Sequence, residues 1–251
     1  MNFAPLPDDW PVQRDRLQRI ATHVLANAQH HVSGHVALTV LPGGFGTPEF
    51  GPDRSRVRIA GGSLHVERAD GERDGERAAT SVVVPIAGSS IRELCEAAGV
   101  EPDPDLTVGD DTPVLGDPDE MIVLDSGATG VVGDWFALGQ RAIDAAVASL
   151  PDPRASVVRL WPEHFDVGVD LAPDAARRPG VRCNLGASAG DPLHQEPYLY
   201  VGPWGEERPG PDGFWNAPFG AVLGFGDLDM SENPLAAATE FFLHGIARLR
   251  M

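Results

Sequence analysis

The sequence predicts an α+β protein in which antiparallel sheets pack against helices. Three observations lead to this prediction. Apolar residues recur every three or four positions in three long stretches, as in amphipathic helices. Short alternating runs separated by glycine or proline indicate hairpins rather than crossover connections. Each half of the chain, 12–98 and 133–250, has the order of a long helix, about four strands and a closing helix, which suggests two similar halves without a residue-level repeat.

The composition is that of a globular protein. Of the 251 residues 42% are apolar, which is enough for a sizeable core, and we expect residues 1–251 to form a single globular unit. Within it we distinguish two halves, 1–100 and 121–251, joined by an acidic, proline-rich connector at 101–120. No apolar run approaches the roughly 18 to 20 residues of a membrane span. The first residues lack the basic and apolar blocks of a signal peptide, so we expect a cytoplasmic protein.

The charged residues exclude several classes of function. The net charge of −18 repels phosphate backbones and attracts cations, so nucleic acid is not an expected partner. All 19 basic residues are arginine. A Schiff-base lysine, a phosphate-loop lysine and a lysine general base are therefore excluded. The two cysteines, Cys95 and Cys183, are expected to be buried apolar residues and not a metal motif.

The N-terminal half begins with an amphipathic helix at 12–31, on whose polar side we place His23, His30 and His31 as solvated residues. A strand at 35–41 and a glycine-rich and proline-rich loop at 42–53 follow it. Further strands are predicted at 56–60, 63–67 and 80–85, and the tandem DGER at 70–77 between the last two is expected to be an exposed turn. Ser90 and Glu93 fit a capping box at the start of a helix that ends at Ala98.

The second half follows the connector, which we expect to be solvated. A short strand at 121–124 precedes a helix at 133–150, which Pro151 ends. Three strand-like runs then occupy 155–204, with a further, glycine-interrupted strand at 219–228. A last helix at 234–249 begins after Asn233, which is a suitable N-cap residue.

The densest group of polar residues lies in 155–204. Residues two apart on a strand share a face, so His164 would point with Asp166, and His194 with Glu196. If these runs are neighbours, Asp191 joins them in a polar ligand site. The same residues could also act as general acid and general base. Four of them could hold a divalent metal: His164, Asp166, His194 and Glu196. The alternative is structural, with Asp191 and Glu196 bonding turn amides beside prolines.

A literal GxSxG occurs at 186–190, around Ser188. In hydrolases this motif is a turn from a strand into a helix, followed by an acid and a histidine. Asp227 or Asp229 with His244 would have the required order. The segment after Ser188 leads instead into the strand-like PYLYV, so we favour a glycine-rich hairpin turn.

Aromatic residues flank the same stretch. Trp161 lies at its start, and Tyr198, Tyr200 and Trp204 share a strand face near its end. Aromatic residues at period two usually pack on a sheet, but their company of glycine and proline also suggests the rim of a pocket for a small organic molecule.

Four blocks, LWPEHFD at 160–166, GASAGD at 186–191, EPYLYVGPW at 196–204 and FWNAPFGA at 214–221, resemble a family of uncharacterised bacterial proteins, a domain of unknown function. The resemblance covers about the last hundred residues. It implies relatives but no activity, cofactor or catalytic residue.

The sequence thus predicts a small-molecule ligand site formed by polar and aromatic residues: His164, Asp166, Asp191, His194, Glu196, Trp161, Tyr198, Tyr200 and Trp204. A metal-dependent hydrolase using the same His and carboxylate cluster is the alternative, with two histidines and a carboxylate holding the ion. A third hypothesis is a partner-binding protein that uses an aromatic rim of Trp204, Trp215 and Phe219. No cofactor other than a divalent metal is expected, and the sequence does not decide whether the protein is an enzyme.

Overall fold

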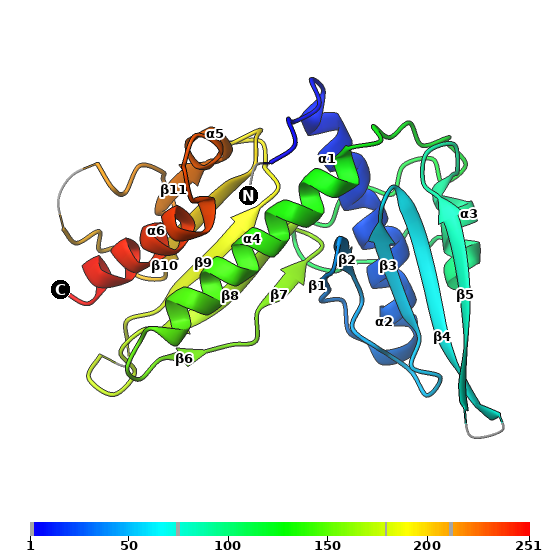
Figure 1. Cartoon of the computed structure of the whole chain (residues 1–251), viewed down its shortest axis with the longest axis horizontal. Coiled ribbons are helices and arrows are strands. Elements are labelled where there is room, and N and C mark those ends of the chain that lie inside the picture. The colour runs from blue at the N-terminus through cyan, green and yellow to red at the C-terminus, as the bar shows by residue number, and fades with distance from the viewer. Residues whose placement is uncertain (1–2, 74–75, 179, 211–212) are drawn as a thin grey trace. The chain divides into compact units, whose positions relative to one another are not determined.

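The computed structural model describes residues 3–73, 76–178, 180–210 and 213–251, without the side chains of 70–79. It has helices and two antiparallel sheets (Figure 1), which confirms the predicted α+β class. The chain divides into two compact units. We call 4–134 with 160–165 the N-terminal unit, and residue 3 with 135–159 and 166–251 the C-terminal unit. Among the described helices, none combines the length and apolarity that crossing a membrane requires.

The N-terminal unit contains a five-stranded antiparallel sheet in the order β1-β2-β3-β4-β5. Its strands are β1 (Thr39–Leu41), β2 (Gly44–Gly46), β3 (Arg56–Ala60), β4 (Ser63–Arg73) and β5 (Glu76–Pro85). The predicted strands at 56–60, 63–67 and 80–85 are confirmed. The expected exposed turn at 70–77 is wrong in extent, because β4 and β5 continue into it. Residues 74–75 and the side chains of 70–79 lie outside the described residues.

One long helical stretch accompanies this sheet and confirms the helix predicted at 12–31. It comprises α1 (Trp10–Ile20), a π-helical turn η1 (Ala21–Ala26) and α2 (Asn27–Ser33). In η1 the backbone amide of Asn27 donates to Thr22 and Val24 instead of His23. The carbonyl of His23 is thereby freed, and it accepts from the buried thiol of Cys95 at 3.3 Å. The π turn is thus compensated by a contact from the neighbouring helix α3 (Ile91–Ala98).

Side chains of this helix hold the connector by hydrogen bonds to its backbone carbonyls. Arg19, His23 and Asn27 follow each other at four-residue spacing, and their side chains bond the carbonyls of Leu115, Pro113 and Glu101 at 2.5, 2.7 and 2.9 Å. Leu106 and Leu115 of the connector are buried. His23 is only 2% exposed, so the expectation that it is solvated is wrong, whereas His30 and His31 are exposed as predicted. Burial lowers the pKa of His23.

Two further expectations for this unit need correction. The loop predicted at 42–53 contains strand β2, where Phe45 is fully buried and packs edge-on against Phe165 at 5.5 Å. Gly44 allows this strand, because a Cβ there would lie 1.8 Å from the Ile59 carbonyl oxygen. The strand predicted at 121–124 is reduced to an isolated bridge between Ser90 and Met121. The capping box is confirmed, since Ser90 and Glu93 bond each other's backbone amides.

The C-terminal unit is built on an antiparallel sheet in the order β11-β10-β9-β8-β6. Its strands are β6 (Arg154–Ala155), β8 (Asp166–Ala172), β9 (Cys183–Ser188), β10 (Tyr198–Pro203) and β11 (Ala221–Gly224). The chain passes between the units through β7 (Arg159–Trp161). The strand predicted at 219–228 is only partly right: β11 ends at Gly224, and α5 (Phe225–Asp229) follows.

Two helices cover one face of this sheet (Figure 1): α4 (Ala128–Ala148), which belongs to this unit from Trp135 onward, and α6 (Pro234–Leu249). Gly139 of α4 lies against Ala187 of β9, and Gly245 of α6 lies against Val201 of β10. The amide of Ala236 is capped by Asn233, as predicted. Because side chains alternate along a strand, residues neighbouring Ala187 and Val201 point to the opposite face. That face contains the tyrosines and carboxylates of the predicted site.

Candidate functional site

Three neighbouring strands, with the turn between two of them, bring a serine, two aspartates and two tyrosines together at the polar face of the C-terminal sheet. The register places Asp166 of β8 opposite Ser188 of β9, and Ser188 opposite Tyr198 of β10. The next row on this face consists of Gly168, Gly186 and Tyr200. We call Asp166, Ser188, Asp191, Tyr198 and Tyr200 the Tyr–Asp cluster.

Tyr200 of β10 reaches across β9 to bond Asp166 of β8. Its hydroxyl donates to Oδ2 of that carboxylate. The ring can do so only because residue 186 is glycine: a Cβ there would lie 2.3 Å from Cζ of Tyr200. At Gly168 a Cβ would lie 3.3 Å from the Tyr200 hydroxyl. The Tyr200 ring therefore packs over the two glycines, and this packing determines the position of its hydroxyl.

Asp191 is positioned by the turn between β9 and β10. Its Oδ1 accepts from the amides of Leu193 and His194 at 2.7 and 2.8 Å, an arrangement typical of an aspartate that closes its own turn. Its Oδ2 accepts from the hydroxyl of Tyr198. Asp191 therefore bonds turn amides, as in the structural interpretation, and also belongs to the cluster.

Both phenols are kept neutral by their surroundings. Burial, and then the adjacent carboxylate, raise the pKa of Tyr200 well above its usual value. Burial, followed by the bond to Asp191, raises the pKa of Tyr198 in the same direction. The cluster is thus a pair of protonated phenols that donate to two carboxylates, and neither phenol is suited to act as a general base near neutral pH.

This arrangement predicts the alkaline titration of the protein. The chain has two tyrosines, and both belong to the cluster, so the tyrosinate absorbance of folded protein should not rise near pH 10. A folded-state pKa above the unfolded value contributes stability below pH 10, and this stability is lost as the pH rises further. Ultraviolet titration with and without denaturant measures this. Two tyrosines ionising near pH 10 in folded protein would contradict the described bonds.

Aromatic rings border the cluster. The imidazole of His194 lies 5.0 Å from the ring of Tyr198, and Phe219 lies 6.4 Å from Tyr198 and 6.3 Å from Tyr200. Asp166, Ser188 and Tyr198 are buried, whereas Asp191, His194, Tyr200 and Phe219 are partly exposed. The solvent-accessible part of the site therefore belongs to Asp191, His194, Tyr200 and Phe219, and the other residues of the cluster are buried.

The structure brings together some of the predicted site residues and not others. Asp166, Asp191, His194, Tyr198 and Tyr200 form the cluster and its border. Glu196 is exposed and makes no hydrogen bond or ion pair with any described residue. Trp204 is 57% exposed, donates to Asn184 and stacks with Arg182. Trp161, at the end of β7, is 37% exposed.

His164 does not share a strand face with Asp166, which corrects the expectation from two-residue spacing. Residues 162–165 form a turn, and Phe165 has a positive φ of 49°. The strand begins only at Asp166, so the alternation does not extend back to His164. His164 belongs to the N-terminal unit and Asp166 to the C-terminal unit. The His164 ring is exposed, and its Nδ1 lies 3.4 Å from Asp111.

Ser188 does not have the surroundings of a hydrolase nucleophile. It ends strand β9, is 3% exposed, and its hydroxyl accepts from the amide of Gly190. In the strand register Ser188 lies opposite Tyr198. The next element is strand β10 and not a helix. The hairpin turn favoured from the sequence is therefore confirmed, and the Ser188 hydroxyl bonds within that turn.

The metal hypothesis lacks a ready ligand set. Within the described part of the chain, no three His, Cys, Asp or Glu side chains are placed so that they could hold one ion. Two carboxylates of the cluster already accept phenolic hydrogen bonds. His164, Asp166, His194 and Glu196 as a metal site remains a prediction.

Sequence reasoning missed the residues that shape the site. Gly168 and Gly186 were not candidates, and Phe219 was considered only for an aromatic rim. Two glycines on strands opposite an aromatic residue are nevertheless a known sign of close approach. The comparisons add no relative: neither the family models, nor the curated proteins, nor the solved structures contain a match to this chain. The resemblance of the four C-terminal blocks to a family therefore stays a prediction.

Proposed function

We propose that the protein binds a small organic cation at the Tyr–Asp cluster. The observation that supports this is the pair of Tyr–Asp hydrogen bonds on one sheet face, bordered by His194 and Phe219. Aromatic faces attract ammonium and guanidinium groups, and carboxylates bond them directly. The phenols already donate to the carboxylates, so the site offers acceptors and ring faces rather than donors.

The charge of the whole chain favours the same ligand class. A net charge of −18 raises the local concentration of cations and repels anions. The absence of lysine also leaves arginine as the main basic competitor for carboxylates. Arg182, which directly precedes β9, pairs with Asp170 and stacks on Trp204. We expect binding to be strongest at low ionic strength.

Calorimetric titration with agmatine and choline tests the proposal, with glutarate as an anionic control. Asp191→Asn removes one negative charge from the cluster and should weaken binding of the preferred cation by about tenfold or more, since a charge-assisted bond is worth about 1.5 to 3 kcal/mol. Asp229→Asn is the matched control, because Asp229 is exposed in α5 of the same unit. It removes the same charge and should change the affinity less than about twofold.

Tyr200→Phe provides a second variant that keeps the ring. The substitution removes the hydrogen-bond donor to Asp166 and should alter the affinity for the cation. A thermal melt of the variant reports whether the fold is preserved. If neither cation binds, or if Asp191→Asn and Asp229→Asn weaken binding equally, the cluster is not the site.

The alternative functions have tests of their own. A metal-dependent hydrolase requires a stoichiometric transition metal, or thermal stabilisation on adding one, and elemental analysis of the purified protein addresses this. A partner-binding rim has less exposed aromatic surface than expected, because Trp215 bonds the Pro209 carbonyl and Phe219 packs on the tyrosines. Light scattering over a concentration series addresses self-association through Trp204.

A further inference from the structure

One titratable side chain is buried among the contacts that hold the connector. Arg19, His23 and Asn27 follow one another along the helical stretch and bond connector carbonyls, and His23 is the middle of the three. It is 2% exposed and lies in the π-helical turn η1. Of these three residue types, only histidine ordinarily changes its charge near neutral pH. The connector is therefore held in part by a group that can respond to acid.

The bond to the connector fixes the protonation state of His23. Its Nε2 lies 2.7 Å from the carbonyl oxygen of Pro113. A carbonyl oxygen can only accept, so Nε2 carries the proton of the neutral imidazole and Nδ1 is a bare acceptor. Nδ1 is buried and has no hydrogen-bond partner among the described residues. A second proton, on Nδ1, would therefore create a buried donor without an acceptor and a buried charge.

The groups around the imidazole favour its neutral form. Burial is the largest influence and lowers the pKa of His23, and the bond to Pro113 opposes it more weakly. Arg19 lowers the pKa further, and Asp103 raises it with the smallest effect of the four. From α3, the thiol of Cys95 contacts the backbone of His23, and burial raises the pKa of that thiol to about 12, so it stays neutral. The nearby carboxylate therefore does not compensate for burial of the imidazole.

The direction of the pH effect follows from this geometry. A lowered folded-state pKa gives a stabilisation that is present above the ordinary histidine value of 6.5 and is lost as the pH falls from there through the lowered value. We propose that His23 is a pH switch for the connector, which is bound to the helix while the imidazole is neutral and is released when the imidazole is protonated. In the released state water can solvate both ring nitrogens.

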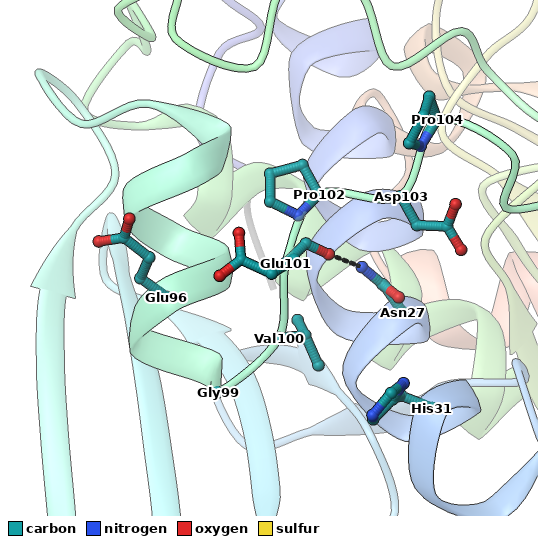
Figure 2. A pocket seen from close by; sticks show the side chains of 9 residues that line it. All are labelled: Asn27, His31, Glu96, Gly99, Val100, Glu101, Pro102, Asp103 and Pro104. Carbon is teal, nitrogen blue, oxygen red and sulfur yellow. Dashed lines mark hydrogen bonds between the residues drawn. The ribbon is translucent and has the colours of Figure 1, made fainter.

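Release of the connector removes one wall of a pocket in the same unit. Figure 2 shows this pocket, of about 610 Å³, between α2, the end of α3 and the connector. At the start of the connector the side-chain amide of Asn27 donates to the Glu101 carbonyl at 2.9 Å, four residues along the helix from His23. The pocket exists only while the connector is in place, so acid should open it to solvent.

Hydrogen exchange of the full chain between about pH 5 and about pH 8 tests the switch. After correction for the intrinsic exchange rate, the protection of segment 101–115 should fall below pH 6.5, by at most about tenfold per pH unit, which is the slope for one proton. Segment 56–66 in β3 and β4 should keep its protection. His23→Gln should abolish the dependence, because glutamine can donate to Pro113 but does not titrate. His30→Gln is the matched control and should behave as wild type, because His30 is exposed on α2.

Histidine ¹⁵N NMR of the wild-type protein is a second test that requires no variant. His23 should have an unprotonated Nδ1 at neutral pH and should titrate below 6.5. The proposal is overturned if His23 titrates at or above that value, if acid leaves 101–115 protected or exposes 56–66 equally, or if His23→Gln keeps the wild-type dependence. These results do not depend on the Tyr–Asp cluster, which belongs to the C-terminal unit.

Discussion

Gly186→Ala should destabilise the protein by on the order of 3 kcal/mol and abolish the Tyr200–Asp166 hydrogen bond. The new methyl carbon would lie 2.3 to 2.4 Å from three atoms of Tyr200, including its hydroxyl. Because the ring lies flat across the sheet, it must lift away as a whole. Overpacking costs about 1 to 3 kcal/mol, and a buried carboxylate that loses its donor costs a similar amount. Urea unfolding of the variant measures the total loss in the free energy of unfolding.

Gly202→Ala is the matched control for this substitution. Gly202 lies on β10 two residues after Tyr200, and a Cβ there would meet nothing closer than 4.0 Å. Its free energy of unfolding should differ from wild type by less than about 0.5 kcal/mol. Equal losses at positions 186 and 202 would show that the strands simply tolerate no side chain, and the account of Tyr200 would be wrong.

Gly139→Ala should also destabilise, although alanine is the better helix former by about 1 kcal/mol. The new Cβ in α4 would lie 2.3 Å from the Cβ of Ala187 on β9. Both atoms are fixed to backbone, so the helix has to move off the sheet, and overpacking of about 1 to 3 kcal/mol outweighs the gain in propensity. We expect a net loss of about 1 to 2 kcal/mol in the free energy of unfolding.

A second substitution tests whether that contact is the cause. Ala187→Gly removes the opposing methyl group, so the double variant Gly139→Ala/Ala187→Gly should recover at least about 1 kcal/mol relative to the sum of the single changes. Gly130→Ala on the same helix serves as the control, because a Cβ there meets no atom within 4 Å. It should be neutral or stabilising. Strictly additive losses for the pair would contradict the described helix–sheet contact.

The sequence predicted those elements whose periodicity is unbroken and whose ends have side-chain caps. The helix ending at Ala98 has a capping box, and the last helix begins directly after its N-cap Asn233, as expected. In the N-terminal sheet, the strands predicted at 56–60, 63–67 and 80–85 follow from alternation, whereas β2 was not predicted. The π turn is invisible to such reasoning, because Ala21–Ala26 has ordinary helical composition and its distortion is compensated by Cys95, which is distant in sequence.

The predicted grouping of side chains is found where alternation is uninterrupted, and it fails where one backbone angle intervenes. Tyr198 and Tyr200 share a face, and Asp166 meets them, as strand pairing implies. His164 was misplaced because Phe165 adopts a left-handed conformation, which is uncommon for an aromatic residue. Glu196 precedes β10 and remains exposed, because the turn before it is organised by Asp191.

The roles of glycine were the least predictable part. The sequence shows that residues 168 and 186 are glycines but not which ring lies over them, since that depends on the register between β8, β9 and β10. The same holds for the connector. Its acidic, proline-rich composition predicted solvation, yet Arg19, His23 and Asn27 bond its backbone carbonyls. The composition does not reveal such bonds, because every residue has a backbone carbonyl.

Tyrosine-selective NMR tests the central claim most directly, because both tyrosines of the chain belong to the Tyr–Asp cluster. In protein with ¹³C-labelled tyrosine rings, every ring signal reports on the proposed site. Titration with agmatine or choline should shift both rings, with one saturating curve, and Asp191→Asn should weaken that curve by about tenfold. Ring signals that stay unmoved at saturating concentrations of both cations, or that respond equally to glutarate, would contradict the account.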